Sequence, residues 1–224
     1  MIADLIETVP DDLLDQSGKV FYSGRDAFQP GRPVYVLGYN PGGAPADRPG
    51  ETLRQNIDDV TRRRPANWSA YRDECWGGKP AGRAKFQPVM CDFLESLGLD
   101  PGEVPASNLI FVRSSRAADL NHAHTHVDRC WPFHARVLDT VNPQAIIALG
   151  SQTGGIIRSR LKVETEIARF VEPNNRGWTS LAHRAPDGRL IFTLTHPSVA
   201  RWTTPATDPR NMVTSVLIET GAIR

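Results

Sequence analysis

A chain of 224 residues, 40% hydrophobic and 23% charged, is long enough to bury one core, and we expect a single domain over residues 1–224. No stretch approaches the roughly 18 apolar residues that a membrane-spanning helix needs, and the first residues lack the basic start and apolar centre of a secretory signal. We therefore expect a cytoplasmic protein without a membrane partner. The formal net charge of +1 says nothing about a nucleic-acid partner.

The three cysteines, Cys75, Cys91 and Cys130, lie far apart in the sequence and form no CxxC pair. This spacing argues against a disulfide framework and against a metal site made of four thiolates. We expect these thiols to be buried or incidental.

The first predicted strand covers residues 34–37, an apolar run rich in β-branched and aromatic side chains. It opens into residues 38–43, a loop of Gly, Tyr, Asn and Pro whose glycines allow backbone amides to approach a ligand closely. The side-chain amide of Asn40 offers both a donor and an acceptor there. The alternative is a surface turn in which Asn40 only caps its own backbone.

The next region combines basic and aromatic residues. Leu53, Ile57 and Val60 recur at helical spacing, and residues 65–82 are typical of a long functional loop. A stripe of apolar residues over 86–97 predicts a helix that ends at Gly98. The combination of basic and aromatic residues suits phosphate contact and base stacking, although a charge run such as the arginine triplet at 62–64 is more typical of a solvated helix end. Its members are Arg62, Arg63, Arg64, Lys79, Arg83 and Lys85 beside Trp68, Tyr71, Trp76 and Phe86.

The second half of the chain alternates strands and helices. Apolar runs predict strands at 108–112, 145–149 and 190–194. Asp128 can cap a helix reaching Val141, a second helix follows over 150–161, and a third covers 212–217. Residues 162–189 show no regular pattern. Continuous apolar strands separated by helices predict a parallel sheet covered on both faces. The expected fold is a three-layer α/β/α sandwich with a central four-stranded parallel sheet.

Four polar loops follow the predicted strands, at residues 38–43, 113–116, 150–152 and 196–201. The carboxyl ends of parallel strands meet at one sheet edge, so we expect these loops to form one site. His196 opens the last loop, where it can donate a hydrogen bond to an oxygen that gains charge, and Ser198 can reach a phosphate. A purely structural role for a strand-end histidine is the alternative.

Two other kinds of site are less well supported. His122-x-His124-x-His126 would place three imidazoles on one side of an extended chain and could hold zinc, although a histidine-rich surface loop is the better account of the pattern. The chain has no Gly-x-Ser-x-Gly elbow and no phosphate-binding Gly-x-x-x-x-Gly-Lys loop, which removes the usual anchor of serine hydrolases and of P-loop nucleotide hydrolases. We expect no metal.

The sequence resembles the uracil-DNA glycosylase superfamily through two motifs, Gly38-Tyr39-Asn40-Pro41-Gly42 and His196-Pro197-Ser198. The order and spacing between them are similar to those of the bacterial and archaeal iron–sulfur members, so the resemblance covers residues 33 to 200. The segments that carry it are 82–84, 108–113, 130–133 and 143–150. The resemblance implies an α/β/α sandwich and removal of uracil or a related deaminated base from DNA by base flipping.

The resemblance also implies roles for single residues. Asn40 would orient the water that attacks the sugar C1′, and His196 would stabilise the departing base anion at O2. Asn108 would bind the Watson–Crick edge of the flipped base. The backbone of Gly38, Tyr39, Pro41 and Gly42 would hold that base, Ser198 a flanking phosphate, and Val199, Ala200 and Arg201 would lie where the family inserts a wedge into the duplex. We also expect Arg113 and Arg116, after the second strand, to contact DNA.

The departures from the family pattern concern the iron–sulfur cluster, the residue that stacks on the nucleobase, and the catalytic general base. Val112 stands where a cluster cysteine would be and only Cys130 matches, so we expect no iron–sulfur cluster and no other cofactor. Ala81 is nearest to the family's stacking Phe, and Trp76, Tyr39 or Phe86 would take its place. Asn40 cannot act as a general base, which favours slow hydrolysis or a broader, mismatch-type specificity.

The leading hypothesis is therefore a monomeric, monofunctional DNA glycosylase of base excision repair, with damaged DNA as its partner. A catalytically weak or inactive protein that binds nucleic acid or a nucleobase on the same fold is the alternative. A metal-dependent hydrolase built on the three histidines is a third.

Overall fold

The computed structural model describes residues 1–223 and contains one mixed sheet of six strands in the order β2-β1-β3-β6-β5-β4. The strands are β1 (Val34–Gly38), β2 (Ala106–Asn108), β3 (Ala145–Leu149), β4 (Thr165–Val171), β5 (Thr179–Arg184) and β6 (Leu190–Leu194). β1 pairs in parallel with β2 and β3, and β3 in parallel with β6, whereas β5 runs antiparallel to both β6 and β4. The predicted α/β class is confirmed.

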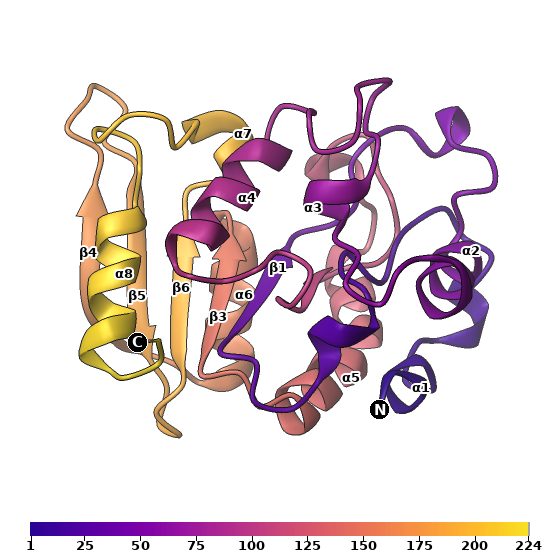
Figure 1. The fold of residues 1–224 in the computed structure, drawn as a ribbon, viewed down its shortest axis with the longest axis horizontal. Helices are drawn as coiled ribbons and strands as arrows, with labels where there is room; N and C mark the ends of the chain where they lie inside the picture. Colours follow the sequence, from indigo (N-terminus) through magenta and orange to yellow (C-terminus); the bar gives the residue numbers. More distant parts are fainter. Residues whose placement is uncertain (224) are drawn as a thin grey trace.

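Helices flank the sheet (Figure 1), with α4 and α8 in front of it and α5 and α6 behind it in that view. The helices are α1 (Ile2–Ile6), α2 (Leu53–Asp58), α3 (Ala70–Asp73), α4 (Gln87–Ser96), α5 (Ala123–Thr140), α6 (Ser151–Leu161), α7 (Pro197–Ala200) and α8 (Arg210–Glu219). A π-helical turn, Asp59–Arg63, continues α2.

The central strands are buried on both faces because their alternate residues enter two different cores. Val34 and Val36 of β1 pack with residues of α4 and α8, whereas Tyr35 and Leu37 pack with residues of α5. All five residues of β1, of β3 and of β6 are buried. This burial explains the continuous apolar runs that made these strands visible in the sequence.

The prediction of four parallel strands was incomplete, because β4 and β5 lie in residues 162–189, for which no regular structure was expected. β4 is the edge strand and most of its residues are exposed. An edge strand of this kind carries charged residues such as Glu166 and Arg169 and lacks the apolar signal of a central strand. These two strands make the sheet mixed.

Three predicted boundaries also differ. The strand expected at 108–112 is β2, which ends at Asn108, while Leu109 and Ile110 continue as buried chain whose N–H groups donate to the carbonyls of Gly38 and Tyr39 at 2.8 and 2.9 Å. α5 begins at Ala123, five residues before the expected cap. The loop expected at 65–82 contains the short helix α3. Within residues 1–223, no helix has both the length and the apolar character needed to cross a membrane.

Candidate active site

A cavity of about 500 Å³ lies beyond the carboxyl ends of β1, β2, β3 and β6, where the sequence predicted a site. Polar groups follow or end β1, β2 and β6 there, the end of β3 contributes Leu149, and aromatic and charged residues come from the segments that cover the cavity. The lining residues are Lys19, Tyr22, Gly38, Tyr39, Asn40, Gly42, Arg48, Glu51, Tyr71, Trp76, Phe86, Asn108, Arg113, Ala117, Leu149, His196 and Ser198. The size falls within the range of small-molecule sites.

The side chain of Asn40 is held in one orientation. Its Nδ2 donates to the carbonyl oxygens of Pro41 and Val112, each at 3.2 Å, and to Oγ of Ser114 at 2.8 Å. Ser114 Oγ itself donates to the carbonyl of Arg116, so towards Asn40 it is an acceptor. Three acceptors around one atom identify it as the amide nitrogen. Oδ1 accepts from no donor in the described chain and is left for a ligand or a water molecule in the cavity.

The register between β1 and β2 places Asn108 at the site. It pairs with Gly38 at the ends of β2 and β1, and its side chain crosses over that glycine. A Cβ at position 38 would lie 2.1 Å from Asn108 Oδ1, so only glycine leaves room for the amide. The hydroxyl of Tyr22 lies beside the same amide, and Asn108 is only 6% exposed. The amide is thus presented at the inner end of the cavity.

His196 has a defined tautomer. Its Nδ1 accepts the backbone N–H of Ser198 at 3.2 Å and lies 2.7 Å from Ser198 Oγ. A backbone amide can only donate, so Nδ1 carries no proton and the neutral ring is protonated on Nε2. Burial lowers the pKa of His196, which favours that neutral ring. Nε2 meets no acceptor among residues 1–223, which leaves one N–H donor at the cavity.

Four aromatic side chains form a continuous wall of the cavity. Phe86 lies 5.5 Å from the His196 ring, 5.4 Å from Trp76 and 5.9 Å from Tyr71, centroid to centroid. Tyr22 closes the set at 6.2 Å from both Tyr71 and Trp76. Trp76 and Phe86 were predicted base contacts, and both line the cavity; Tyr22 was missed because the segment around it has no local pattern. Tyr39 also lines the cavity, with its hydroxyl accepting from Gln152 at 2.8 Å.

Lys19 and Glu74 form an ion pair beside this wall, and no pattern in the sequence indicated it. Lys19 Nζ lies 2.6 Å from both carboxylate oxygens of Glu74, and Trp76 Nε1 donates to Glu74 Oε2 at 2.6 Å. Burial lowers the pKa of Lys19, and the neighbouring Glu74 opposes that shift. Lys19 lines both the cavity and a neighbouring hollow, whereas Glu74 lines only the neighbouring hollow.

Arg113 lies at the cavity but its guanidinium is occupied. It donates to the carbonyl of Gly42 at 2.5 Å, to Ser17 Oγ at 3.2 Å and to Glu51 at 2.6 Å, and its side chain is 5% exposed. These contacts fix the loop after β1, and the DNA contact expected of Arg113 stays a prediction. Glu51 is shared with Arg48 at 2.8 Å.

Of the other expected DNA contacts, Ser198 lines the cavity, and Val199, Arg201 and Arg116 are near lining residues in the sequence. Ser198 and Val199 are in α7, Arg201 follows it in a left-handed conformation, and Arg116 precedes a short 3₁₀ turn. Val199 is 55% exposed, which is unusual for an apolar residue. Pro41 is buried under the loop and does not line the cavity.

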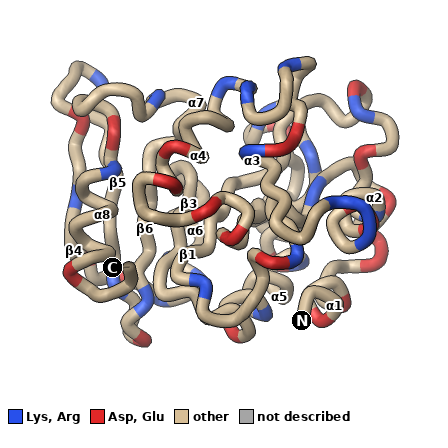
Figure 2. Tube along the Cα trace, viewed as in Figure 1, with Lys and Arg blue, Asp and Glu red and all other residues tan. Residues whose placement is uncertain are grey.

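The basic residues divide into two groups. Lys79, Arg83 and Lys85 are exposed in the loop between Trp76 and Phe86, and no carboxylate of the described residues pairs with them. Arg62 and Arg63 instead pair with Asp58 and Asp59. Figure 2 shows basic segments in the loops along the edge of the molecule that carries α7. The arginine triplet therefore fits a solvated helix end, and the free cations gather near the cavity.

The three histidines do not share one side. His122 is the left-handed residue before α5, and His124 and His126 lie two residues apart within that helix, so they point to different faces. The extended chain that a zinc site required is absent. No group of three potential metal ligands is found in residues 1–223.

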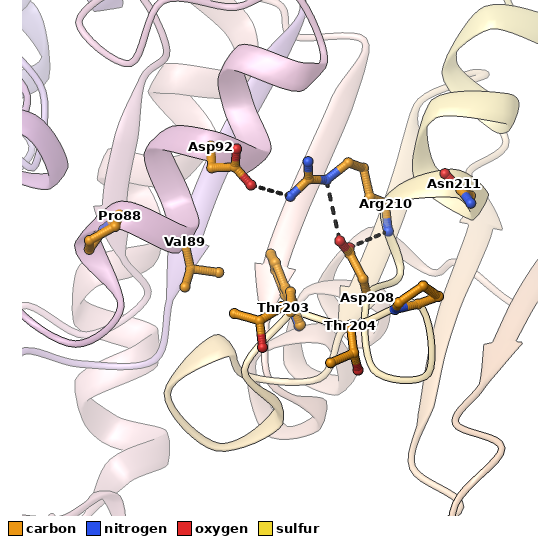
Figure 3. Close-up of a pocket in the computed structure, with 10 residues that line it drawn as sticks. Pro88, Val89, Asp92, Thr203, Thr204, Asp208, Arg210 and Asn211 are labelled. Carbon is orange, nitrogen blue, oxygen red and sulfur yellow. Dashed lines mark hydrogen bonds and ion pairs between the residues drawn. The ribbon is translucent and has the colours of Figure 1, made fainter.

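A larger hollow of about 610 Å³ lies between α4 and the segment before α8 (Figure 3). Its charged groups already pair with one another, since Arg210 bridges Asp92 at 2.5 Å and Asp208 at 3.5 Å. The predicted site residues all lie elsewhere. We therefore place the candidate site in the cavity at the strand ends.

A buried histidine, His134, supports the chain next to Asn108. His134 Nδ1 accepts from the hydroxyl of Tyr35 at 2.8 Å, and its Nε2 donates to the carbonyl of Leu109 at 3.1 Å, next to Asn108. Burial lowers the pKa of His134 to about 4. The ring is thus neutral at physiological pH and braces the chain that presents Asn108.

His134 should make the stability of the protein depend on pH. In the unfolded chain His134 binds a proton below its ordinary pKa of 6.5, whereas in the folded chain it binds one only below about pH 4. The free energy of unfolding is therefore highest above pH 6.5 and decreases as the pH falls towards 4. The loss should reach about 3 kcal/mol. Urea unfolding of the parent and His134→Gln chains between pH 7 and 4 measures it; His124→Gln serves as the exposed control. Parallel pH profiles for parent and His134→Gln would contradict the assignment.

Comparison of the sequence with protein-family models and with curated proteins gives no match.

Proposed function

We propose that this chain is a monofunctional DNA glycosylase that flips uracil or a related deaminated base out of DNA and hydrolyses its N-glycosidic bond. The observation that carries the proposal is the orientation of two side chains at one cavity: Asn40 offers a free acceptor, and His196 a free N–H donor. In this proposal the parallel strands β2, β1, β3 and β6 form the catalytic core, and β5 and β4 extend it. No metal or organic cofactor is needed.

The chemistry follows from these two orientations. Asn40 Oδ1 accepts a hydrogen bond from a water molecule and directs its lone pair at C1′ of the flipped nucleotide. The new C–O bond forms as the C1′–N bond breaks, and the bonding electrons leave with the base. His196 Nε2–H donates to the base oxygen on which that charge develops, and a fixed donor there lowers the barrier. The water gives its second proton to solvent.

The remaining walls suit a flipped base. The aromatic set of Tyr22, Tyr71, Trp76 and Phe86 provides faces for stacking, and the Asn108 amide can pair with a base edge. Arg113, Arg48 and Lys19 outnumber Glu51 and Glu74 around the cavity, so the local charge favours a departing anion.

The test is excision from end-labelled oligonucleotides that contain uracil, hypoxanthine or xanthine, in single strands and opposite each normal base. We expect alkali-labile cleavage by the parent chain and its loss in Asn40→Ala and His196→Ala. Absence of cleavage at high enzyme excess would overturn the proposal.

Binding without cleavage is the second candidate, and one observation favours it. The carboxylates nearest the cavity, Glu51 and Glu74, are both ion-paired, so no free carboxylate stands ready as a base. Tight binding of DNA that contains a deaminated base, without any abasic product, would support this candidate.

DNA binding should depend on the free cations beside the aromatic wall. We expect Lys79→Gln/Arg83→Gln/Lys85→Gln to weaken binding and to reduce the slope of log affinity against log salt by about 2 to 3, because each lost phosphate contact removes nearly one released counterion. Arg62→Gln/Arg63→Gln is the control, since those arginines are already paired with aspartates. Fluorescence anisotropy at several salt concentrations measures both slopes. Equal slopes in the parent and the triple variant would exclude this loop from the interface.

A further inference from the structure

Lys19 is a buried cation at the cavity to which the proposed mechanism assigns no contact with the substrate. Its side chain is 10% exposed and that of Glu74 18%. A buried ion pair contributes little net stability because both partners lose hydration, so stability alone does not account for a charge at this place. The pair also separates the cavity from the hollow that Glu74 lines.

The backbone around Lys19 is fixed. The backbone N–H of Lys19 donates to the carbonyl of Phe111 at 2.9 Å, and the N–H of Gly18 donates to the backbone carbonyl of Glu51 at 2.9 Å. A Cβ on Gly18 would lie 2.1 Å from the Phe111 carbonyl oxygen, so glycine is required for this close approach. The backbone that carries Lys19 is therefore fixed, and Glu74 holds its ammonium group.

The ammonium group has one donor left for the cavity. An ammonium carries three N–H donors and no acceptor. Two of them meet the oxygens of Glu74, and the third meets no acceptor within residues 1–223. Lys19 Nζ lies 5.2 Å from the centroid of Tyr22, whose hydroxyl is beside the Asn108 amide. Lys19 lines both the cavity and the neighbouring hollow, and on the cavity side its ammonium group lies over the ring of Tyr22, near the Asn108 amide.

We propose that Lys19 selects the base: its remaining N–H donates to the exocyclic oxygen that deamination creates, O4 of uracil or O6 of hypoxanthine. This inference rests on the proposed glycosylase function. Cytosine and adenine carry an amino group at that position, and its hydrogens would face a donor that cannot accept. Glu74 holds the ammonium in place, and the Asn108 amide pairs with the neighbouring ring N–H. The site then binds a carbonyl next to an N–H.

The test compares uracil with 2-pyrimidinone, which lacks the oxygen at C4, in otherwise identical oligonucleotides under single-turnover conditions. We expect Lys19→Met to slow uracil excision by about 10- to 100-fold, the value of one hydrogen bond to a charged donor, and to leave 2-pyrimidinone excision near the parental rate. The uracil preference over cytosine should fall as well. Lys162→Met, at an exposed position outside the cavity, is the matched control.

A second variant guards against misfolding. Lys19→Met leaves Glu74 without its cation, whereas Lys19→Met/Glu74→Gln removes the charge and keeps an acceptor for Trp76 Nε1. Both variants are checked by thermal unfolding, and the double variant should show the same loss on uracil alone. If the parent excises uracil but both variants slow the two substrates equally, the selection role is overturned and the glycosylase function stands. If the parent excises neither base, the proposed function itself fails.

Discussion

Replacing His196 by alanine is expected to slow base excision about 10²- to 10³-fold in single-turnover assays without unfolding the chain. The departing base gains negative charge on an oxygen, and the variant loses the N–H that is fixed to meet it. Loss of one such preorganised donor costs about 3 kcal/mol in the transition state. The ring is partly exposed and packs edge-on against Phe86 at 5.5 Å, so its removal leaves a void at the cavity and not in either core.

Two controls separate this role from a general disturbance. Ser198→Ala removes the hydroxyl at Nδ1 but keeps the backbone N–H that sets the tautomer, so the rate should fall by less than about tenfold. His124→Ala, at an exposed position of α5, should leave the rate unchanged. Burial holds the pKa of His196 below its ordinary value of 6.5, so the parental rate should stay level as the pH falls through 6.5. A rate that rises there would show that the imidazolium is the working form.

The parts of the fold that the sequence revealed are those with continuous local signals. β3 and β6 were predicted at their observed bounds because all their residues are apolar or buried in one run, and α4 within one residue at its start because its apolar residues are buried at helical spacing. α6 was predicted within one residue at its start from the turn residues that follow β3. β4 was invisible because an exposed edge strand needs no apolar run. β2 was misplaced because Leu109, Ile110 and Phe111 are buried as strongly as a strand, although the ladder ends at Asn108.

The site residues likewise divide into those that a local pattern indicated and those that it did not. Asn40 and His196 follow strands, Asn108 ends β2, and the parallel pairing of those strands brings the three to one edge. The apolar pattern had placed Asn108 at the start of its strand, so only the family resemblance put it in the site. Lys19 and Tyr22 lie in an irregular segment, and the Lys19–Glu74 pair joins residues 55 apart in the sequence. Contacts of this length depend on how the whole chain packs, so no local pattern could indicate them. Arg113 shows the converse, since its position was foreseen and its partners were not.

Asn40→Asp is expected to slow excision at neutral pH by about 10- to 100-fold, although it introduces the carboxylate that a general base would need. The position of Nδ2 is surrounded by the carbonyl oxygens of Pro41 and Val112 and by Ser114 Oγ, whose hydrogen already goes to Arg116. A carboxylate oxygen there would face lone pairs with no proton between them. Its ionised form is therefore penalised, which raises the pKa of the new side chain.

This penalty predicts a pH dependence specific to the variant. Below its raised pKa the aspartic acid carries a hydroxyl that can donate to the same carbonyls and a second oxygen that can still accept from water, so it reproduces the amide. Excision by Asn40→Asp should therefore recover as the pH falls, whereas Asn40→Ala, which has neither group, should stay slow throughout. Single-turnover rates of the three chains between pH 8 and 5 measure this. An Asn40→Asp chain faster than its parent at pH 8 would mean that deprotonation of the water, and not its orientation by Asn40, limits the reaction.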